Sequence, residues 1–212
     1  MNKKKIIKEI LAKFGKGQIN LESESARDMV ADKIIFALTK NVKIIIGNIE
    51  DQDTQVIVNP TNAELAWEDL TVNGAIHREA GVYFTKACED YMSWCGPLQT
   101  NESVFLNGYN ANAEQILNIY PPFWQTADTD EENIEKLYDC YVECFNECIE
   151  NKLTKSISFP LIGAGTFMYP IQASYQILAN VIDDMDVSMF GEIRIVFWKE
   201  EQYNKCKKLF KI

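Results

Sequence analysis

The chain has 212 residues, a formal net charge of −10 at pH 7 and a sequence pI near 4.7. Its length suits one well-buried domain, alone or with an appendage, and its 47% hydrophobic and 25% charged residues are ordinary for a soluble globular protein. The acidic charge without a local basic patch disfavours nucleic acid, and no apolar stretch approaches the roughly 18 residues that a membrane span needs, so we expect neither as a partner.

The first 40 residues are expected to form a helical extension. The opening stretch, MNKKKIIKEILAKFGKG, is basic, and its apolar part is interrupted by Lys8, Glu9 and Lys13. This pattern predicts a short amphipathic helix at about residues 3–14 and not a signal peptide. A second helix is predicted at about residues 23–39. We therefore divide the chain into an extension at residues 1–40 and a main domain at residues 41–212.

The main domain alternates predicted strands and helices. Continuous apolar runs ended by turn residues indicate buried strands, and a period of 3.6 residues indicates helices. The order predicts an α/β fold with a largely parallel sheet. The expected strands are 42–48, 54–60, 102–109, 114–123, the start of 155–170, and 192–199, and the expected helices are 73–94, 130–152, 171–184 and 200–211.

The six cysteines are interpreted as buried free thiols. Cys140, Cys144 and Cys148 recur every fourth residue and share one face of a predicted helix. No Cys-x-x-Cys pair or partner histidine accompanies them, so they are poor zinc ligands. We expect no metal and no cofactor, and a reducing compartment, cytoplasmic or otherwise intracellular.

Unusual residues follow four of the predicted strands. They are Gly47-Asn48, the segment from Asn59 to Asn62, the segment from Gly163 to Phe167, and Phe197-Trp198. In a parallel sheet such strand ends meet at one edge, where ligands bind. The glycines at 163 and 165 let the backbone approach a ligand closely, and the following helix start offers unpaired N–H groups. Together they predict a cleft that binds a diphosphate through backbone amides.

These segments resemble the macro domain family, over about residues 42 to 212. GNI is similar to the family's Gly-Asp-Ile, and VIVNPTN to its Val-Asn-Ala-Ala-Asn. NGAIHREAG and SFPLIGAGTFMYP match motifs of the branch that includes mono-ADP-ribosyl hydrolases. The resemblance implies a three-layer α/β/α fold with a mixed, largely parallel central sheet, and ADP-ribose or ADP-ribosylated protein as the partner.

The resemblance also implies roles for single residues. Asn48 would accept from the adenine amino group, and Ile49 would contact the ligand beside it. Phe197, or its neighbour Trp198, would stack on adenine. Asn59, in the strand-end motif, would also contact the ligand, and Asn62 would hold the hydroxyls of the distal ribose. The diphosphate would be wrapped by a loop that consists of Gly163, Ala164, Gly165, Thr166 and Phe167.

Several departures from the family affect catalysis. Asn62 and Asn73 stand at the positions tied to the hydrolytic step, but Asn73 replaces an acid and cannot act as a general base. The glycine-rich loop of the branch is replaced by AELAWEDLTV at 63–72, whose acids Glu64, Glu68 and Asp69 are candidate substitutes. Asn48 also replaces the family's Asp, and Met168 replaces a usual Gly. His77, the single histidine, is interpreted as structural.

Three functions stay open at this point. The first is a module that binds ADP-ribose without fast turnover. The second is an ADP-ribosyl hydrolase with an altered constellation, acting on mono-ADP-ribosylated protein or O-acetyl-ADP-ribose. The third is a degenerate macro domain that serves as a non-catalytic interaction module. If only the acid is missing, Asn73→Asp should raise turnover.

Overall fold

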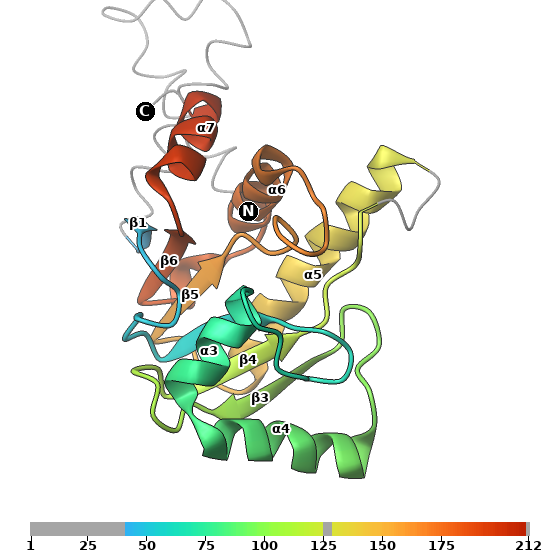
Figure 1. Ribbon diagram of the computed structural model, residues 1–212. Coiled ribbons are helices and arrows are strands. Elements are labelled where there is room, and N and C mark those ends of the chain that lie inside the picture. Colours follow the sequence, from blue (N-terminus) through green and yellow to red (C-terminus); the bar gives the residue numbers. More distant parts are fainter. Residues whose placement is uncertain (1–40, 125–128, 211–212) are drawn as a thin grey trace, which may run out of the picture. The chain divides into compact units, whose positions relative to one another are not determined.

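The computed structural model describes residues 41–124 and 129–210 (Figure 1). The expected helices at 3–14 and 23–39 lie outside the described residues, and the division at residue 40 stays a prediction. Residues Lys43–Ile212 belong to one compact unit. The elements are β1 (Val42–Ile46), β2 (Val56–Pro60), α3 (Val72–Ala80), α4 (Val82–Cys95), β3 (Ser103–Asn107), β4 (Gln115–Ile119), α5 (Asp130–Glu150), β5 (Ser156–Pro160), α6 (Ile171–Asp184), the 3-10 turn η1 (Val187–Met189), β6 (Glu192–Phe197) and α7 (Glu200–Phe210).

The strands form one six-stranded sheet in the order β1-β6-β5-β2-β4-β3. The pairs β2–β4, β2–β5 and β5–β6 are parallel, whereas β3 runs antiparallel to β4. The expected mixed, largely parallel sheet is therefore confirmed. The antiparallel pair is possible because β3 and β4 are joined by a short connection, whereas parallel neighbours need a longer crossover.

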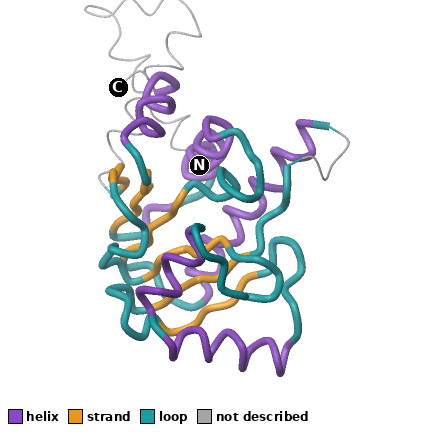
Figure 2. The backbone as a smooth tube through the Cα atoms, in the orientation of Figure 1, coloured by secondary structure: helices purple, strands orange, loops and turns teal. Residues whose placement is uncertain are grey.

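Helices cover both faces of the sheet, which gives three layers (Figures 1 and 2). On one face, Ile57 of β2 and Ile116 of β4 are paired in register and pack with Ile76 of α3 and Phe84 of α4. Residue Ser158 of β5 pairs with Ile57, so the next side chain along β5 points to the opposite face. That side chain, Phe159, lies 4.9 Å (ring centroids) from Phe145 of α5.

One expected helix is two helices in the structure. The periodic stretch at 73–94 is divided at Gly81 into α3 and α4. Gly81 has φ 82° and ψ −175°, a backbone conformation that residues other than glycine rarely adopt. Its N–H donates to His77 O and ends α3. The apolar period continues across the break because both helices pack on the same core.

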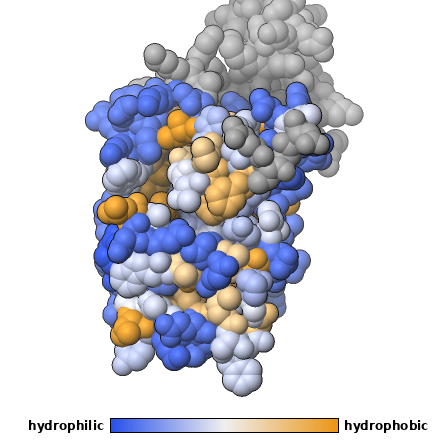
Figure 3. Space-filling model, turned by 45° about the vertical axis from the view of Figure 1, so that its right-hand side comes forward, coloured by the Kyte–Doolittle hydropathy of each residue, from blue (hydrophilic) through white to orange (hydrophobic). Residues whose placement is uncertain are grey.

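The face seen in Figure 3 is mostly hydrophilic, with smaller hydrophobic areas between the polar residues. Exposed apolar side chains lie on many elements, as is usual for folded domains, and two of them, Tyr83 and Tyr109, stack on each other at 6.5 Å. None of the helices in the described ranges is long and apolar enough to cross a membrane.

Candidate functional site

The candidate site lies at the carboxyl edge of the sheet, where the four segments noted in the sequence meet. They follow β1, β6, β5 and β2, which are consecutive in the strand order. Gly47 N donates to Phe197 O at 2.9 Å, so the ends of β1 and β6 are side by side. Parallel pairing brings the ends of β6, β5 and β2 to the same edge.

A buried network of three asparagines supports the end of β2. Asn59 is fully buried, and its Nδ2 donates to Asn118 Oδ1 at 2.8 Å and to Asn73 Oδ1 at 3.0 Å. Asn73 Nδ2 in turn donates to Ala66 O at 2.6 Å. The network therefore ties β2, β4, α3 and the loop at 63–72 together through neutral amides. The expected ligand contact of Asn59 and the expected catalytic position of Asn73 therefore need correction. Both side chains are buried, so they support the site from beneath and offer no surface to a ligand.

Asn62, the predicted ribose contact, holds the loop that follows it. Its Nδ2 donates to Ala66 O at 3.1 Å and to Glu68 Oε1 at 3.0 Å, and its Oδ1 accepts from Ala66 N at 2.8 Å. Both amide protons are therefore engaged, whereas the carbonyl oxygen keeps one lone pair for a further donor. Leu65 is buried beneath the loop with 1% of its surface exposed.

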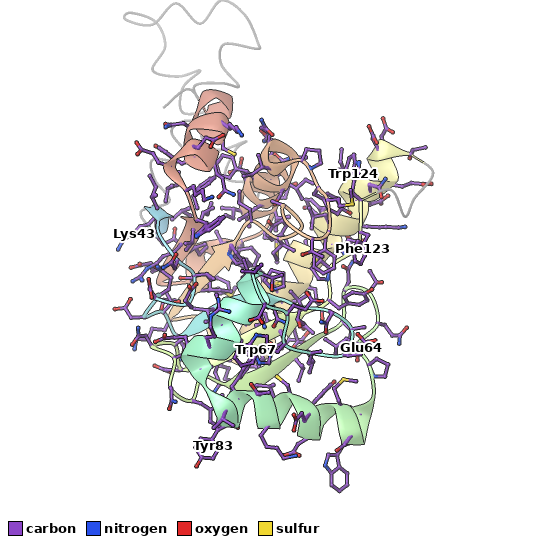
Figure 4. The ribbon with its side chains drawn as sticks, viewed as in Figure 1. Lys43, Glu64, Trp67, Tyr83, Phe123 and Trp124 are labelled. Atoms are coloured by element: carbon purple, nitrogen blue, oxygen red, sulfur yellow. The ribbon has the colours of Figure 1, made fainter. Side chains whose placement is uncertain are left out.

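The aromatic residue of this loop is held against α3. The ring centroid of Trp67 lies 5.6 Å from that of His77, and Trp67 Nε1 donates to Asp69 Oδ1 at 2.9 Å. Asp69 also forms an exposed ion pair with Arg78 at 3.4 Å. Figure 4 shows Trp67 and Glu64 at separate places on the loop. The loop thus has defined contacts although it contains no glycine.

The loop after β5 carries the backbone groups expected to bind phosphate. Four of its amides donate to no acceptor within residues 41–124 and 129–210; they are those of Gly163, Gly165, Thr166 and Phe167. An added Cβ at Gly165 would meet nothing within 4 Å, so this position faces open space. Gly163 has φ +84°, and a Cβ there would come within 2.8 Å of the Tyr169 ring. Glycine is therefore needed at 163 for the fold and leaves the backbone open at 165.

A buried hydroxyl cycle fixes the start of this loop. Ile162 N donates to Tyr141 Oη at 2.8 Å, and Ser174 Oγ donates to Ile162 O at 2.7 Å. The two hydroxyls lie 2.9 Å apart, so Tyr141 donates to Ser174 and all three bonds are satisfied. Burial raises the pKa of Tyr141 well above its usual range, so the phenol keeps its proton. The loop is thereby positioned by α5 and α6 before any ligand arrives.

Aromatic rings support the other end of the same loop. The Phe167 ring is 8% exposed and lies 4.6 Å from that of Phe123 and 6.2 Å from that of Tyr120. Trp124 N donates to Phe167 O at 2.8 Å, and Phe123 and Trp124 are close together in Figure 4. Phe167 therefore presents its backbone amide at the site while its side chain packs inward.

Asn48, on the loop after β1, is oriented by its neighbours. Its Nδ2 donates to Asp51 Oδ2 at 2.9 Å, and its backbone carbonyl accepts from Gln52 Nε2 at 2.8 Å. This arrangement leaves Asn48 Oδ1 as the acceptor at the end of the side chain. Ile49 is buried with 4% exposure, so its side chain belongs to the core.

The expectation for Phe197 needs correction. Its ring is fully buried, at 5.3 Å from that of Tyr175 and 5.6 Å from that of Tyr203 (centroids). A ring enclosed in this way has no free face for a base. The alternative, Trp198, is 62% exposed, with Lys199 Nζ 3.9 Å from its ring centroid. We therefore move the predicted adenine contact from Phe197 to Trp198.

His77 has a structural environment. It is 1% exposed, its Nδ1 lies 2.9 Å from Thr85 Oγ1, and its ring packs edge-on against Phe84 at 4.8 Å. Burial lowers the pKa of His77. The ring is therefore neutral at pH 7. No group of three or more His, Cys, Asp or Glu side chains in the described part of the chain is arranged to hold a metal ion.

Asn118 and Asp51 were not identified from the sequence. Asn118 stands inside an apolar strand, and a lone amide in such a run is a signal for a buried polar contact. Asp51 is three residues after Asn48, a spacing that favours a local side-chain bond in a turn. Neither signal names a ligand, because the partner residue is known only from the fold.

Comparisons with known proteins agree with this geometry. The sequence model of the family described as Macro domain matches residues 58–178. A macro domain-containing protein of Caldanaerobacter subterraneus subsp. tengcongensis is 27% identical over 174 residues, which cover 82% of this chain and 97% of that protein. An O-acetyl-ADP-ribose deacetylase of an Enterobacter species is 27% identical over 143 residues, 68% of this chain and 77% of that enzyme.

The fold also has solved counterparts. A mutant macrodomain of Oceanobacillus iheyensis, in a structure with ADPR, superposes with a TM-score of 0.72 and 30% sequence identity. The alignment covers 80% of this chain and 91% of that one. The two chains therefore share a fold over most of the length of each.

Proposed function

The chain belongs to the macro domain family, and from this premise we propose that it binds ADP-ribose, free or attached to a protein, at the carboxyl edge of its sheet. Two relatives support the ligand class. The Oceanobacillus macrodomain structure contains ADPR, and the Enterobacter relative is named for O-acetyl-ADP-ribose. The site of this chain offers amides and carbonyls in place of charged side chains.

The observation that carries the proposal is the set of free backbone amides after β5. The N–H groups of Gly163, Gly165, Thr166 and Phe167 are left without acceptors among the described residues, and Gly165 has no side chain to cover them. Backbone N–H groups near a helix start bind phosphate oxygens without requiring Lys or Arg. A diphosphate at this loop is compatible with the net charge of −10, because its binding depends on local dipoles.

The two ends of the ligand are assigned from the groups that remain available. Asn48 Oδ1 is oriented to accept from the adenine amino group, since Asp51 engages the Nδ2. Trp198 offers an exposed ring for stacking. At the other end, a ribose hydroxyl donates to the remaining lone pair of Asn62 Oδ1.

Thermal unfolding with ADP-ribose, and with AMP in parallel, tests this proposal. Saturation at about 100 times the dissociation constant adds about 2.7 kcal/mol to the free energy of unfolding. For a domain of this size the midpoint should rise by roughly 5–11 °C. AMP lacks the second phosphate and the distal ribose, so its shift should be clearly smaller at the same concentration.

Substitutions at Gly165 provide the matched control. Gly165→Ala and Gly165→Leu place side chains in open space, so both variants should unfold near the wild-type temperature without ligand. The ADP-ribose shift should shrink for Ala and vanish for Leu. If millimolar ADP-ribose shifts neither wild type nor variants, the binding proposal is wrong, and the degenerate interaction module becomes the better interpretation.

A further inference from the structure

We propose that Glu68 is the general base of an esterase reaction, in which the chain hydrolyses an acyl ester on the ribose of its bound ligand. This inference rests on the proposed ADP-ribose binding. Its basis is the hydrogen bond between Glu68 Oε1 and Asn62 Nδ2 at 3.0 Å. Asn62 is the predicted ribose contact, so the Glu68 carboxylate lies directly beside the place expected for the ribose hydroxyls.

The backbone of Glu68 is fixed at the start of α3. Its carbonyl accepts from Thr71 Oγ1 at 2.7 Å. The same carbonyl lies against Gly74, where an added Cβ would be only 2.1 Å away. The half-buried Glu68 side chain therefore extends from a rigid position, which general base catalysis requires for a defined distance to the reacting water.

The other acids near this edge are less suited to the role. Glu64 is exposed and forms no hydrogen bond with a described residue. Asp69 is already engaged by Trp67 Nε1 and by Arg78. Among these three loop acids, only Glu68 contacts the amide that is predicted to hold the ribose.

The position where the family carries an acid is occupied by a structural amide. Asn73 is 1% exposed, accepts from Asn59 and donates to Ala66 O. A neutral amide cannot take a proton from water, and the buried Asn73 side chain cannot reach the ribose. In this chain the carboxylate nearest the predicted ribose contact is therefore Glu68, on the loop before α3, and not a residue at the start of α3.

The reaction is a simple ester hydrolysis with water as the second substrate. The water oxygen forms a bond to the acyl carbon while Glu68 takes one proton from the water. The tetrahedral intermediate then collapses and breaks the bond between the acyl carbon and the ribose oxygen. Glu68 returns its proton to that oxygen, so the products are a carboxylic acid and the free ribose hydroxyl, and the enzyme is unchanged. O-acetyl-ADP-ribose is a substrate of this class.

The test compares acetate release from O-acetyl-ADP-ribose with ADP-ribose binding by calorimetry. Both are measured for wild type, Glu68→Gln, Glu68→Asp and the loop control Glu64→Gln. Glu68→Gln keeps the size and the acceptor for Asn62 but cannot take a proton. Its kcat should fall by about 10²- to 10⁴-fold, the usual size of a general base effect. KM and the dissociation constant of ADP-ribose should stay within about threefold, Glu68→Asp should recover part of the rate, and Glu64→Gln should match wild type.

The two proposals fail in different ways. If wild type binds ADP-ribose but releases no acetate, or if Glu68→Gln keeps the wild-type kcat, the role of Glu68 is wrong and the binding function stands. If Glu68→Gln binds at least about tenfold more tightly with kcat unchanged, Glu68 only competes with the ribose for Asn62. If wild type neither binds ADP-ribose nor releases acetate, both proposals are wrong.

Discussion

Asn73 illustrates how one side chain can change its role while keeping its place in the fold. The sequence predicts that an acid has been lost at this position, so that Asn73→Asp should restore it. The structure shows that both the oxygen and the nitrogen of the Asn73 side-chain amide form hydrogen bonds. Its Oδ1 accepts from Asn59, and its Nδ2 lies 2.6 Å from Ala66 O. A carboxylate would keep the first bond and place an oxygen against the Ala66 carbonyl.

We therefore predict that Asn73→Asp is destabilising and does not raise turnover. The second oxygen of an ionised carboxylate at this buried site has no donor and faces the Ala66 carbonyl, which costs at least about 2 kcal/mol of unfolding free energy at pH 7. Burial raises the folded-state pKa of the introduced acid above its unfolded value of about 3.9, so the folded state binds the extra proton. The penalty should be small near pH 4 and should grow as the pH rises.

Urea unfolding of Asn73→Asp at pH 4.5 and at pH 7 measures this difference. The control is Asn112→Asp, which makes the same chemical change at an exposed position and should cost little at either pH. A wild-type unfolding free energy for Asn73→Asp at pH 7 would show that the loop moves to accommodate the charge, and the buried network would then be less rigid than its bonds suggest.

At the scale of elements, the loop at 63–72 and α3 act as one unit. Thr71 caps α3 by accepting from Gly74 N at 3.1 Å, and the same hydroxyl donates to Glu68 O at 2.7 Å. One side chain therefore satisfies the helix start and fixes the residue that we assign as the base. Glycine-rich loops reach a ligand through bare backbone, whereas this loop reaches the site through side chains that its own hydrogen bonds hold in place.

Thr71→Ala should lower the unfolding free energy by about 1–2 kcal/mol, because it removes an N-cap and a second hydrogen bond. It should also lower the rate of acetate release, since Glu68 loses a contact that positions its backbone. Chemical unfolding and the ester assay measure the two effects. Thr71→Ser keeps the hydroxyl and should behave like wild type in both, and equal losses for the two variants would contradict the assigned contacts.

At the scale of the whole molecule, the cysteines differ in whether they lie in the core or at the surface. All six cysteines are free, and five are buried whereas Cys95 is exposed. Burial raises the pKa of Cys88 and of Cys148 to about 12 and that of Cys206 to about 11. Burial also holds the pKa values of Cys140 and Cys144 well above the usual range. The sequence predicted buried thiols in general, and Cys95 is the exception.

A thiol-specific reagent at pH 8 should therefore modify one cysteine per native chain rapidly and all six in denaturant, because the thiolate is the reactive species. Cys95→Ser should abolish the rapid phase in the native protein. In denaturant the number of modified cysteines should fall by one only, from six to five. Rapid modification of two or more thiols in the native protein would mean that the core opens readily, and it would contradict the packing of α5 against the sheet.

Much of the fold followed from the sequence by itself. Apolar runs ended by Gly-Asn or Pro placed the strands, and the helical period placed α5 and α6 nearly to the residue, because side-chain periodicity reflects which face is buried. The motifs at Asn59–Asn62 and at Gly163–Phe167 also predicted that the candidate site lies at one edge of the sheet, since parallel strands end at one edge. Apolar runs, helical periods and short motifs are local properties, because each can be identified within one segment of the chain.

Only the tertiary structure decided what the individual side chains do. Whether Phe197 or Trp198 faces outward depends on which side of β6 is covered by α6, and the break at Gly81 depends on a backbone conformation that the period does not reveal. The roles of Asn73 and Glu68 depend on partners in other segments, Asn59 and Asn62. Hydrogen bonding requires that donor and acceptor meet in three dimensions. The residue types therefore predicted a polar site, but only the tertiary structure decided which side chains support the site and which are free to contact a ligand.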